Sequence, residues 1–372
     1  MRSKILNRVR TVSLGLFAAG AALLSSASCD RMIYDYEGDC TVNYLLKFRY
    51  DLNLKWADAF ANEVKSVRLY VFDESGTLVR EIDDRGDRLA DPDYAVNLEV
   101  PAGKYHLLAW CGIDNEGAPA QFTVPAATVG STRAEALTCR IDRGADATSS
   151  GRLEFMFHGE LDVDLPEDED GGDYVYTMPL TKDTNHIRVI LQHLSGEDVD
   201  FNQFSFKIED ANGYYASDNR LLPDDAITYL PFSTSSGVAG IIRDDGTGTR
   251  AEIRAKTAVA DFSVGRMMAN RARDMRLTIT NAEGEDIARI PVIDYALLAK
   301  DYYELAYNRT MRDQEFLDRE DEYVMTFFLD ENMKWYAAEI YILSWRIVLH
   351  GYDVNSVRSG SPGRNEDEMT RS

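Results

Sequence analysis

The sequence predicts an all-β protein with two antiparallel β-sandwich domains in tandem. Apolar and polar residues alternate in many short runs, and several of these runs end in a turn of Asp or Asn, two residues and Gly. The runs follow one another at short spacing without long helical patterns, which favours antiparallel sandwiches over a doubly wound parallel sheet. The length of 372 residues fits two domains of roughly 150 residues each.

The first strands follow residue 40. The run "TVNYLLKFRYD" predicts a strand at residues 41–51. In the next alternating run, "VKSVRLYVFDESGTLVREI", Val67, Leu69 and Val71 fall on one face, which is the period of a strand. The DESG turn that follows contains Gly76, which can adopt a positive φ. This segment therefore predicts a β-hairpin.

One local exception lies between these strands. In "NLKWADAFANEVKSV", Trp56, Phe60 and Val64 repeat at every fourth position, with alanines between them. A repeat of four residues is typical of a helix rather than a strand. The stretch predicts a short helix or a single helical turn.

Further strands are expected along the rest of the chain. Residues 94–113 predict a strand, a Pro-Ala-Gly turn and a second strand, and residues 151–165 predict another strand. The segments "FSFKIEDANGYY" (204–215) and "MRLTITNAEGEDIARIPVI" (275–293) repeat the pattern of an alternating run followed by a turn that ends in Gly. Each of these two segments predicts a β-hairpin.

The domain boundary is expected at "LPEDEDGGD", residues 165–173, an acidic Pro/Gly stretch without an apolar period. The predicted N-terminal sandwich covers residues 41–175, and the C-terminal sandwich covers residues 176–351. Residues 352–372 contain little apolar content and predict a disordered polar tail.

The first 28 residues predict an export signal. Basic residues open the chain, no acidic residue occurs before Asp30, and the apolar run that follows is diluted by Ser and Gly. The small residues Ser26, Ala27 and Ser28 then lead directly to Cys29. This pattern predicts cleavage after Ser28 and lipid modification of Cys29, which would begin a linker at residues 29–40. The alternative is an ordinary signal cleaved after Ala27 or Ser28, which would leave Cys29 as a thiol.

The charge of the chain excludes two classes of partner. The formal net charge is −23, and removal of a leader with four cations and no acidic residue brings the exported form near −27. Nucleic acids and anionic membrane surfaces would repel such a protein. We therefore expect no nucleic acid partner, and membrane attachment only through the N-terminal lipid.

Three cysteines remain if Cys29 is acylated: Cys40, Cys111 and Cys139. An oxidising compartment permits one disulfide among them, and the sequence does not choose among the three possible pairings. Three buried free thiols are the other possibility.

No catalytic, metal or cofactor site is expected. The chain lacks the paired histidines and glutamate of a metalloprotease, the Gly-Lys-Ser/Thr ending of a P-loop and the Gly-x-Ser-x-Gly nucleophile elbow. The aspartate-rich runs do not follow the alternate-oxygen pattern of a calcium loop. The four tryptophans lie in apolar local contexts and are expected to pack in the core rather than to form a sugar platform: Trp56, Trp110, Trp335 and Trp345.

Four segments, "DCTVNYLLKFRYDLNLKWADAFANEVKSVRLYVFDESGTLV", "VPAGKYHLLAWCG", "LTKDTNHIRVILQHL" and "SWRIVL", together resemble the FimB-type family of fimbrial anchor subunits of Bacteroides-like bacteria. The most specific pieces are Tyr50-Asp51, the element from Asp58 to Ala61 with the Phe72-Asp73 hairpin, and the run from Asp183 to Asn185. The resemblance spans nearly the whole chain after the leader.

This resemblance implies two transthyretin-like β-sandwich domains and an outer-membrane lipoprotein that carries palmitate at Cys29. It also implies a non-enzymatic role in adhesion, in which the protein attaches or terminates a cell-surface fimbrium and contacts the fimbrial shaft subunits. A surface lipoprotein that binds glycans is the alternative. An exposed row of Trp or Tyr on one sheet would favour glycan binding, whereas an exposed strand edge or groove would favour subunit assembly.

The last apolar alternating segment, "AEIYILSWRIVL" at residues 338–349, has two possible roles. As a donated strand it would pair with a partner subunit, and as an internal strand it would close the second sandwich.

Overall fold

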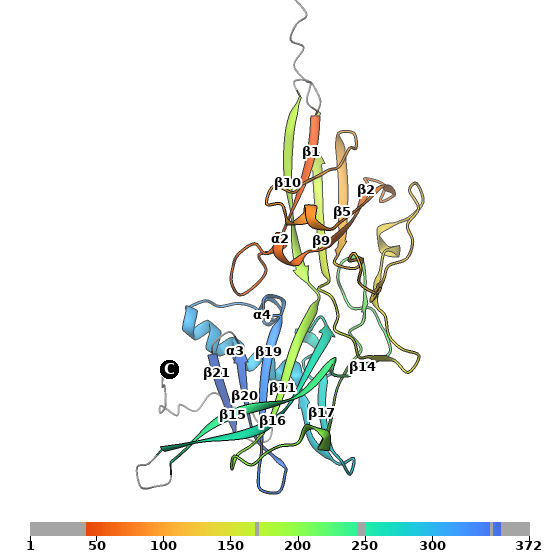
Figure 1. Cartoon of the computed structure of the whole chain (residues 1–372). Helices are drawn as coiled ribbons and strands as arrows, with labels where there is room; N and C mark the ends of the chain where they lie inside the picture. The colour runs from red at the N-terminus through yellow and green to blue at the C-terminus, as the bar shows by residue number, and fades with distance from the viewer. Residues whose placement is uncertain (1–41, 168–170, 245–249, 343–344, 351–372) are drawn as a thin grey trace, which may run out of the picture.

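The computed structural model describes residues 42–167, 171–244, 250–342 and 345–350. The molecule is mostly β and is elongated, with β1, β2, β5, β9 and β10 at one end and β15, β16 and β19 to β21 at the other (Figure 1). The strands of the described residues form four sheets. Within the described residues, no helix has both the length and the apolar character needed to cross a membrane.

The largest sheet has seven strands in the order β3-β2-β5-β9-β10-β1-β4. The strands β1 and β10 run parallel, with Val42 opposite Gly172 and Arg49 opposite Pro179. The strand bounds in this sheet are Val42–Arg49 (β1), Ser66–Asp73 (β2), Leu78–Arg85 (β3), Val96–Asn97 (β4), Gly103–Cys111 (β5), Phe157–Leu165 (β9) and Gly172–Lys182 (β10).

The second sheet has six strands in the order β15-β16-β11-β19-β20-β21. Its central pair, β11 and β19, is also parallel. The bounds are Thr184–His193 (β11), Ser233–Asp244 (β15), Arg250–Gly265 (β16), Glu322–Leu329 (β19), Trp335–Ile342 (β20) and Trp345–His350 (β21). The expectation of antiparallel sheets is confirmed for the other neighbouring strands of these two sheets and is wrong for β1 with β10 and β11 with β19, which are distant in sequence and pair in the same direction.

Two smaller sheets mix strands from both halves of the chain. The five-stranded sheet has the order β18-β17-β12-β14-β8, and the three-stranded sheet has the order β13-β7-β6. Their strands are Phe122–Thr123 (β6), Cys139–Ile141 (β7), Thr148–Ser149 (β8), Phe204–Asp210 (β12), Tyr214–Tyr215 (β13), Ile227–Tyr229 (β14), Arg276–Asn281 (β17) and Asp286–Pro291 (β18). β8 thus joins a sheet built from strands of the second half, and β13 of the second half joins β6 and β7 of the first.

Helices are few. The α-helices are Phe60–Glu63 (α2), Val292–Tyr307 (α3) and Asp313–Arg319 (α4), and four 3₁₀ turns are Asp87–Ala90 (η1), Ala134–Ala136 (η2), Phe201–Gln203 (η3) and Ala269–Arg271 (η4). The short helix predicted around Phe60 is confirmed as α2. The sequence prediction missed α3, although its buried Val292, Tyr295, Ala296 and Ala299 recur at helical spacing after Pro291.

Two of the predicted hairpins form, and one does not. β2 and β3 pair around Gly76, and β17 and β18 pair around Gly284; both glycines have positive φ. The hairpin expected at residues 204–215 is wrong, because β12 pairs with β14 and β17 while β13 pairs with β7. The turn residue Asn212 is instead buried, where its side chain accepts a hydrogen bond from the Tyr229 hydroxyl at 2.6 Å.

Two hydrophobic clusters hold the sheets together. On β5, Leu107, Ala109 and Cys111 enter one cluster, whereas Leu108 and Trp110 enter the other. Because side chains alternate along a strand, β5 is buried on both faces of the seven-stranded sheet. The second cluster is large and also includes side chains of the other three sheets and of α3 and α4.

The acidic stretch at residues 165–173 connects β9 to β10, and both strands belong to the seven-stranded sheet. The strand β10 spans the predicted boundary between residues 175 and 176. A single residue, Asp183, separates β10 from β11, so the backbone passes at that point from the seven-stranded sheet into the six-stranded sheet. The predicted tail, residues 352–372, lies outside the described residues.

The segment at residues 338–349 is divided between two strands. β20 pairs with β19, and β21 folds back on β20, with Ile342 opposite Trp345. The segment therefore lies within the chain's own six-stranded sheet, and β21 forms one edge of that sheet.

Candidate functional site

The residues predicted for lipid attachment, Ser28 and Cys29, lie outside the described residues, as does Cys40. Cys111 and Cys139 are both buried free thiols, so the pairing between these two is not formed. Burial raises the pKa of the Cys111 thiol. The Cys139 thiol lies 3.4 Å from the Met156 sulfur. Thiols in such surroundings are inert.

The described residues contain no group of three or more His, Cys, Asp or Glu side chains placed to hold a metal ion. The polar groups with the most unusual surroundings lie instead where the backbone passes from β10 to β11. We call this region the junction and define it by Lys182, Asp183 and the side chains that contact them.

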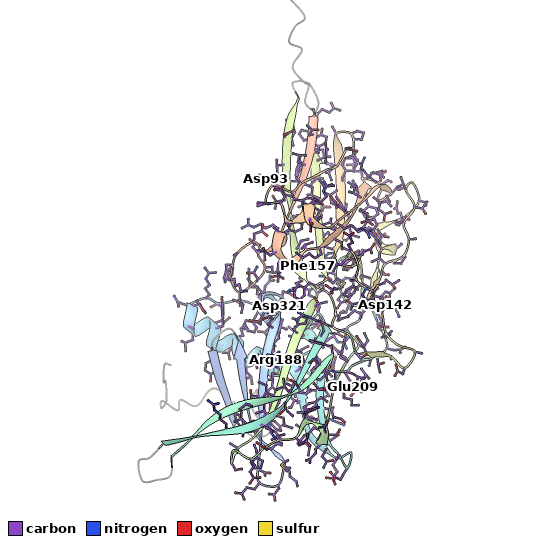
Figure 2. The ribbon with its side chains drawn as sticks, viewed as in Figure 1. Asp93, Asp142, Phe157, Arg188, Glu209 and Asp321 are labelled. Atoms are coloured by element: carbon purple, nitrogen blue, oxygen red, sulfur yellow. The ribbon has the colours of Figure 1, made fainter. Side chains whose placement is uncertain are left out.

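Lys182 places a charge inside the junction. Its side chain is only 2% exposed, and its ammonium pairs with Glu63 of α2 at 2.8 Å and with the carboxylate of Asp321. The ammonium also lies 3.3 Å from the ring centroid of Phe155. Figure 2 shows Phe157 and Asp321 at the level where the seven-stranded sheet gives way to the six-stranded sheet. One cation thus joins α2 to the residue that precedes β19 of the six-stranded sheet.

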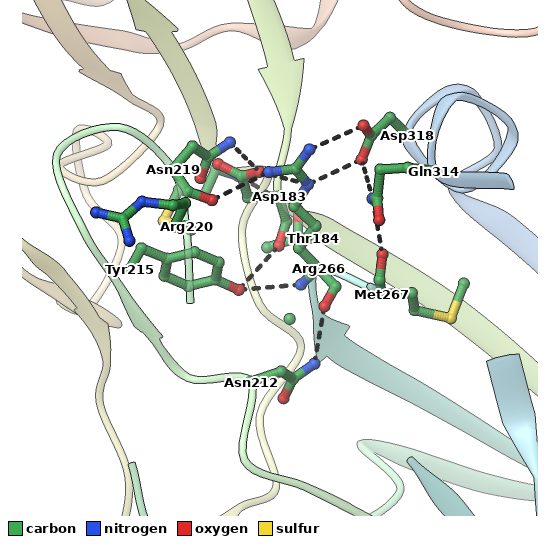
Figure 3. A network of polar contacts seen from close by, with 12 residues as sticks. Asp183, Thr184, Asn212, Tyr215, Asn219, Arg220, Arg266, Met267, Gln314 and Asp318 are labelled. Carbon is green, nitrogen blue, oxygen red and sulfur yellow. Dashed lines mark hydrogen bonds and ion pairs between the residues drawn. The ribbon is translucent and has the colours of Figure 1, made fainter. Parts of the chain in front are cut away.

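Asp183, the next residue in the chain, is fully buried. Figure 3 shows its polar contacts. Its Oδ1 accepts a hydrogen bond from the Asn219 side chain at 2.9 Å and lies 3.6 Å from Nε of Arg266. Its Oδ2 has no hydrogen-bond partner. Burial raises the pKa of the Asp183 carboxyl to about 7, and the nearby Arg266 charge only partly opposes this effect.

Arg266 extends the junction to α4. Its guanidinium donates two hydrogen bonds to the Asp318 carboxylate, both at 2.8 Å. Gln314 donates to Asp318 at 2.9 Å and to the Met267 carbonyl at 3.1 Å. The end of β16, the loop that contains Asn219 and the helix α4 are thereby fixed to the point where the two sheets meet (Figure 3).

A loop from the N-terminal half, residues 50–58, docks on α3 and α4. Its Leu54 is buried in the large cluster, and the Leu54 amide donates to the Arg319 carbonyl at 3.0 Å. The Arg319 guanidinium in turn donates to the Asp51 carbonyl at 3.1 Å. Trp56 closes the loop by donating from Nε1 to the Tyr303 hydroxyl at 3.0 Å.

Trp56 is not a core residue, contrary to the prediction, since 42% of it is exposed. Beside it the C-terminal half of α3 exposes Tyr302 (51%), Leu305 (72%) and Tyr307 (49%). These four residues, together with the exposed cations Lys55, Arg309 and Arg312, are called the α3 surface here. Trp110 is fully buried as expected, and Trp335 packs against the large cluster, whereas the side chain of Trp345 lies outside the described part of the structure.

The six-stranded sheet has two open edges. Within the described residues, β15 pairs only with β16 and β21 only with β20. The hairpin of β15 and β16 extends beyond the body of the molecule in Figure 1. Unpaired backbone N–H and C=O groups at such edges can accept a further strand. The sequence pattern predicted one strand segment at residues 338–349, and the structure divides it between β20 and β21, of which β21 lies at the edge.

The family model described as fimbrillin-A associated anchor proteins Mfa1 and Mfa2 matches residues 36–351 of the chain. The minor fimbrium anchoring subunit Mfa2 of Porphyromonas gingivalis is 26% identical over 230 residues, which are 61% of this chain and 68% of that protein.

Two solved structures from Bacteroides thetaiotaomicron are similar over most of the chain. One, described as an adhesin, is 31% identical with a TM-score of 0.72, over 85% of this chain and 100% of that one. The other, described as polysaccharide-binding, is 28% identical with a TM-score of 0.68, over 83% of this chain and 98% of that one.

Proposed function

The chain belongs to the non-enzymatic family of fimbrillin-A associated anchor proteins Mfa1 and Mfa2, and from that membership we propose that it is a lipoprotein that anchors or terminates a fimbrium at the outer membrane. The observation that carries this proposal is the family match over residues 36–351, nearly all of the chain after the predicted export signal. The 31% identical adhesin supports a role at the cell surface.

Membrane attachment is assigned to the acylated Cys29. Each buried methylene of an acyl chain contributes about 0.8 kcal/mol, and a lipoprotein carries more than one chain, so the attachment is stable without a spanning helix. The Cys29→Ala variant should lose acylation and leave the membrane fraction, whereas Cys40→Ala, the matched control, should remain in it. Retention of Cys29→Ala in membranes after alkaline extraction without detergent would contradict this assignment.

The proposed partners are fimbrillin subunits, joined by strand addition at an edge of the six-stranded sheet. A strand from a subunit would satisfy the open backbone groups of β15 or β21, and its alternate side chains would pack against the sheet. The test is a pull-down of the tagged, lipidated protein from native outer membranes. Polymeric fimbrial subunits should accompany it, and their absence would reject the proposed function.

We also propose two transthyretin-like sandwich domains, assigned to residues 41–175 and 176–351, with a lipidated linker at residues 29–40 and a polar tail at residues 352–372. The presence of two large sheets, one mainly in each half of the chain, supports this division. Because β10 pairs with β1 and β9 as far as Lys182, the first domain would continue to the junction.

Glycan binding is a second candidate, and the 28% identical structure described as polysaccharide-binding favours it. The exposed aromatic side chains Trp56, Tyr302 and Tyr307 lie on a loop and a helix rather than in a row on one sheet. Two guanidinium groups also lie over the Trp56 ring, where a stacked sugar would have to bind. Retention of the protein on surface polysaccharide from the same cells would support this candidate.

A further inference from the structure

The α3 surface combines exposed aromatic and aliphatic side chains with cations. Tyr302 and Leu305 are three residues apart on α3 and are therefore neighbours on its surface, and Ala306, four residues after Tyr302, is also exposed. Tyr307 packs its ring against Tyr303, with 4.6 Å between the centroids. Single exposed apolar residues are ordinary, whereas a group of them within one turn of helix and an adjacent loop is a candidate interaction site.

Trp56 is held rigidly at the edge of this surface. Besides its hydrogen bond to Tyr303, the Trp56 ring has the Arg319 guanidinium 3.6 Å from its centroid. Its φ of 55° lies in the left-handed region, which is unfavourable for a tryptophan. Docking of residues 50–58 on α3 and α4 compensates for this backbone strain, so the exposed part of the indole has a fixed position.

Arg309 follows α3 and lies over the same ring, 4.2 Å from its centroid. The Arg309 amide donates to the Glu304 carbonyl at 3.1 Å, which ties the residue to the end of the helix. A guanidinium stacked on an aromatic ring keeps its N–H groups free at its edge, in the geometry that binds a carboxylate through two hydrogen bonds.

The cations of the α3 surface have no anionic partners within the described part of the chain. Lys55, Arg309 and Arg312 are exposed and form no ion pair with another described residue. Elsewhere on α3 a cation is paired: Lys300 contacts Glu304 at 3.1 Å and Asp313 at 3.4 Å. Lys55 precedes Trp56 and Arg312 precedes α4 in the sequence, and together with Arg309 these cations complement an anionic partner.

We propose that the α3 surface binds an acidic segment of a fimbrillin subunit, with a carboxylate of that segment on Arg309 and its apolar side chains against Tyr302 and Leu305. This inference rests on the proposed function and adds a second contact to strand addition. An acidic polypeptide fits better than an acidic glycan, because the Trp56 ring is covered by guanidinium groups and Leu305 offers only an aliphatic contact.

The test measures binding of the full exported protein to a purified fimbrillin subunit from the same cells, at low and high salt. Arg309→Glu should weaken binding about tenfold or more and reduce the salt dependence of binding. The affinity of Arg309→Lys should lie between those of Arg309→Glu and the wild type. Leu305→Glu, at an exposed position where folding is not at risk, should also weaken binding. Arg276→Glu makes the same charge change at an exposed position of β17 and should bind like the wild type.

Equal binding by Arg309→Glu, Leu305→Glu and Arg276→Glu would overturn this inference while leaving the proposed function intact. Failure of the wild-type protein to bind any fimbrillin subunit would overturn both. If Arg309→Glu instead abolished binding of an acidic polysaccharide and left subunit binding unchanged, the partner class would be a glycan and the inference would be wrong.

Discussion

At the level of single residues, the junction depends on buried ionisable groups whose polar contacts are only partly satisfied. Lys182 is buried with two carboxylates, whereas Asp183 retains one oxygen without a hydrogen-bond partner. Moving a charged group out of water is costly unless partners replace the lost hydration. The two neighbouring residues therefore respond differently to substitution and to pH.

Replacing Lys182 with Met should lower the free energy of unfolding by about 2–3 kcal/mol, because Glu63 and Asp321 would face one another without a cation. Both carboxylates are partly exposed, so the cost should fall below that of a fully buried pair. Urea denaturation measures the change. Lys207→Met, which removes a surface pair with Glu209, should change stability by less than about 1 kcal/mol. Equal effects of the two substitutions would contradict this account.

Asp183 should make the protein less stable as pH rises. The folded carboxyl keeps its proton up to about pH 7, whereas the unfolded carboxyl releases it near 3.8, so folding takes up a proton between these values. The free energy of unfolding should therefore fall through this window, by about 2 kcal/mol between pH 5 and pH 7 for this one group. Asp183→Asn should remove that part of the pH dependence.

The measurement compares the stability of wild type and Asp183→Asn at pH 5 and pH 7. The comparison is necessary because burial also lowers the pKa of His158 to about 4, which makes stability rise with pH between 4 and 6.5. The His158 contribution is common to both proteins and cancels in the difference. Parallel stability curves for the two proteins would show that Asp183 does not titrate in this range.

At the level of helices and strands, the sequence correctly predicted those elements that depend on interactions between residues close together in the chain. The hairpins around Gly76 and Gly284 form because each turn has a glycine with positive φ between alternating strands. The failed hairpin at residues 204–215 had the same local pattern, but Asn212 found a buried partner, Tyr229, distant in sequence. The parallel pairing of β1 with β10 likewise depends on contacts that no local pattern encodes.

The candidate site was less predictable than the fold. Asp183 belonged to the run from Asp183 to Asn185 that carries part of the family resemblance. Its burial, however, depends on Asn219 and Arg266, which come from distant parts of the chain. Trp56 was expected in the core because its neighbours are apolar, yet the docked loop buries Leu54 and leaves the indole at the surface. The helical period of α3 was visible in the sequence, and the position of its exposed face was not.

The end of β5 provides a test of close packing between elements. A Cβ atom added to Gly112 would lie 1.8 Å from the Phe155 carbonyl oxygen, and the φ of Gly112 is also positive. Gly112→Ala should destabilise the protein by more than about 3 kcal/mol, measured by urea denaturation. Gly117→Ala is the matched control, since Gly117 has a similar φ and no atom within 4 Å, and should cost about 1 kcal/mol. Equal losses would show that the backbone at Gly112 relaxes freely.

At the level of the whole molecule, the two halves of the chain are interleaved. β13 pairs with β7 and β14 with β8, so strands before residue 150 and strands after residue 200 share two sheets. The large cluster contains side chains from all four sheets. The two proposed domains are therefore expected to unfold together rather than one at a time.

Limited proteolysis can test this organisation. The acidic stretch between Pro166 and Asp173 is expected to be cut first, because it contains Pro and Gly and lacks apolar residues. Since β9 and β10 lie side by side in one sheet, the two fragments should stay together on a native sizing column and separate only in denaturant. Fragments that separate without denaturant would show that the two halves are held by far weaker contacts.

The parallel pairing of β1 and β10 has a mechanical consequence for an anchor. A pull from the membrane would reach the described structure at Val42, the start of β1, and a load carried by the six-stranded sheet would reach β10 through Lys182, its last residue. Because the strands are parallel and are pulled from opposite ends, the force would shear all eight residue pairs at once instead of opening them one after another. Forced rupture is governed by the unfolding rate, and shear of many hydrogen bonds together slows it. The sheet nearest the proposed lipid would thus be loaded along its most resistant direction.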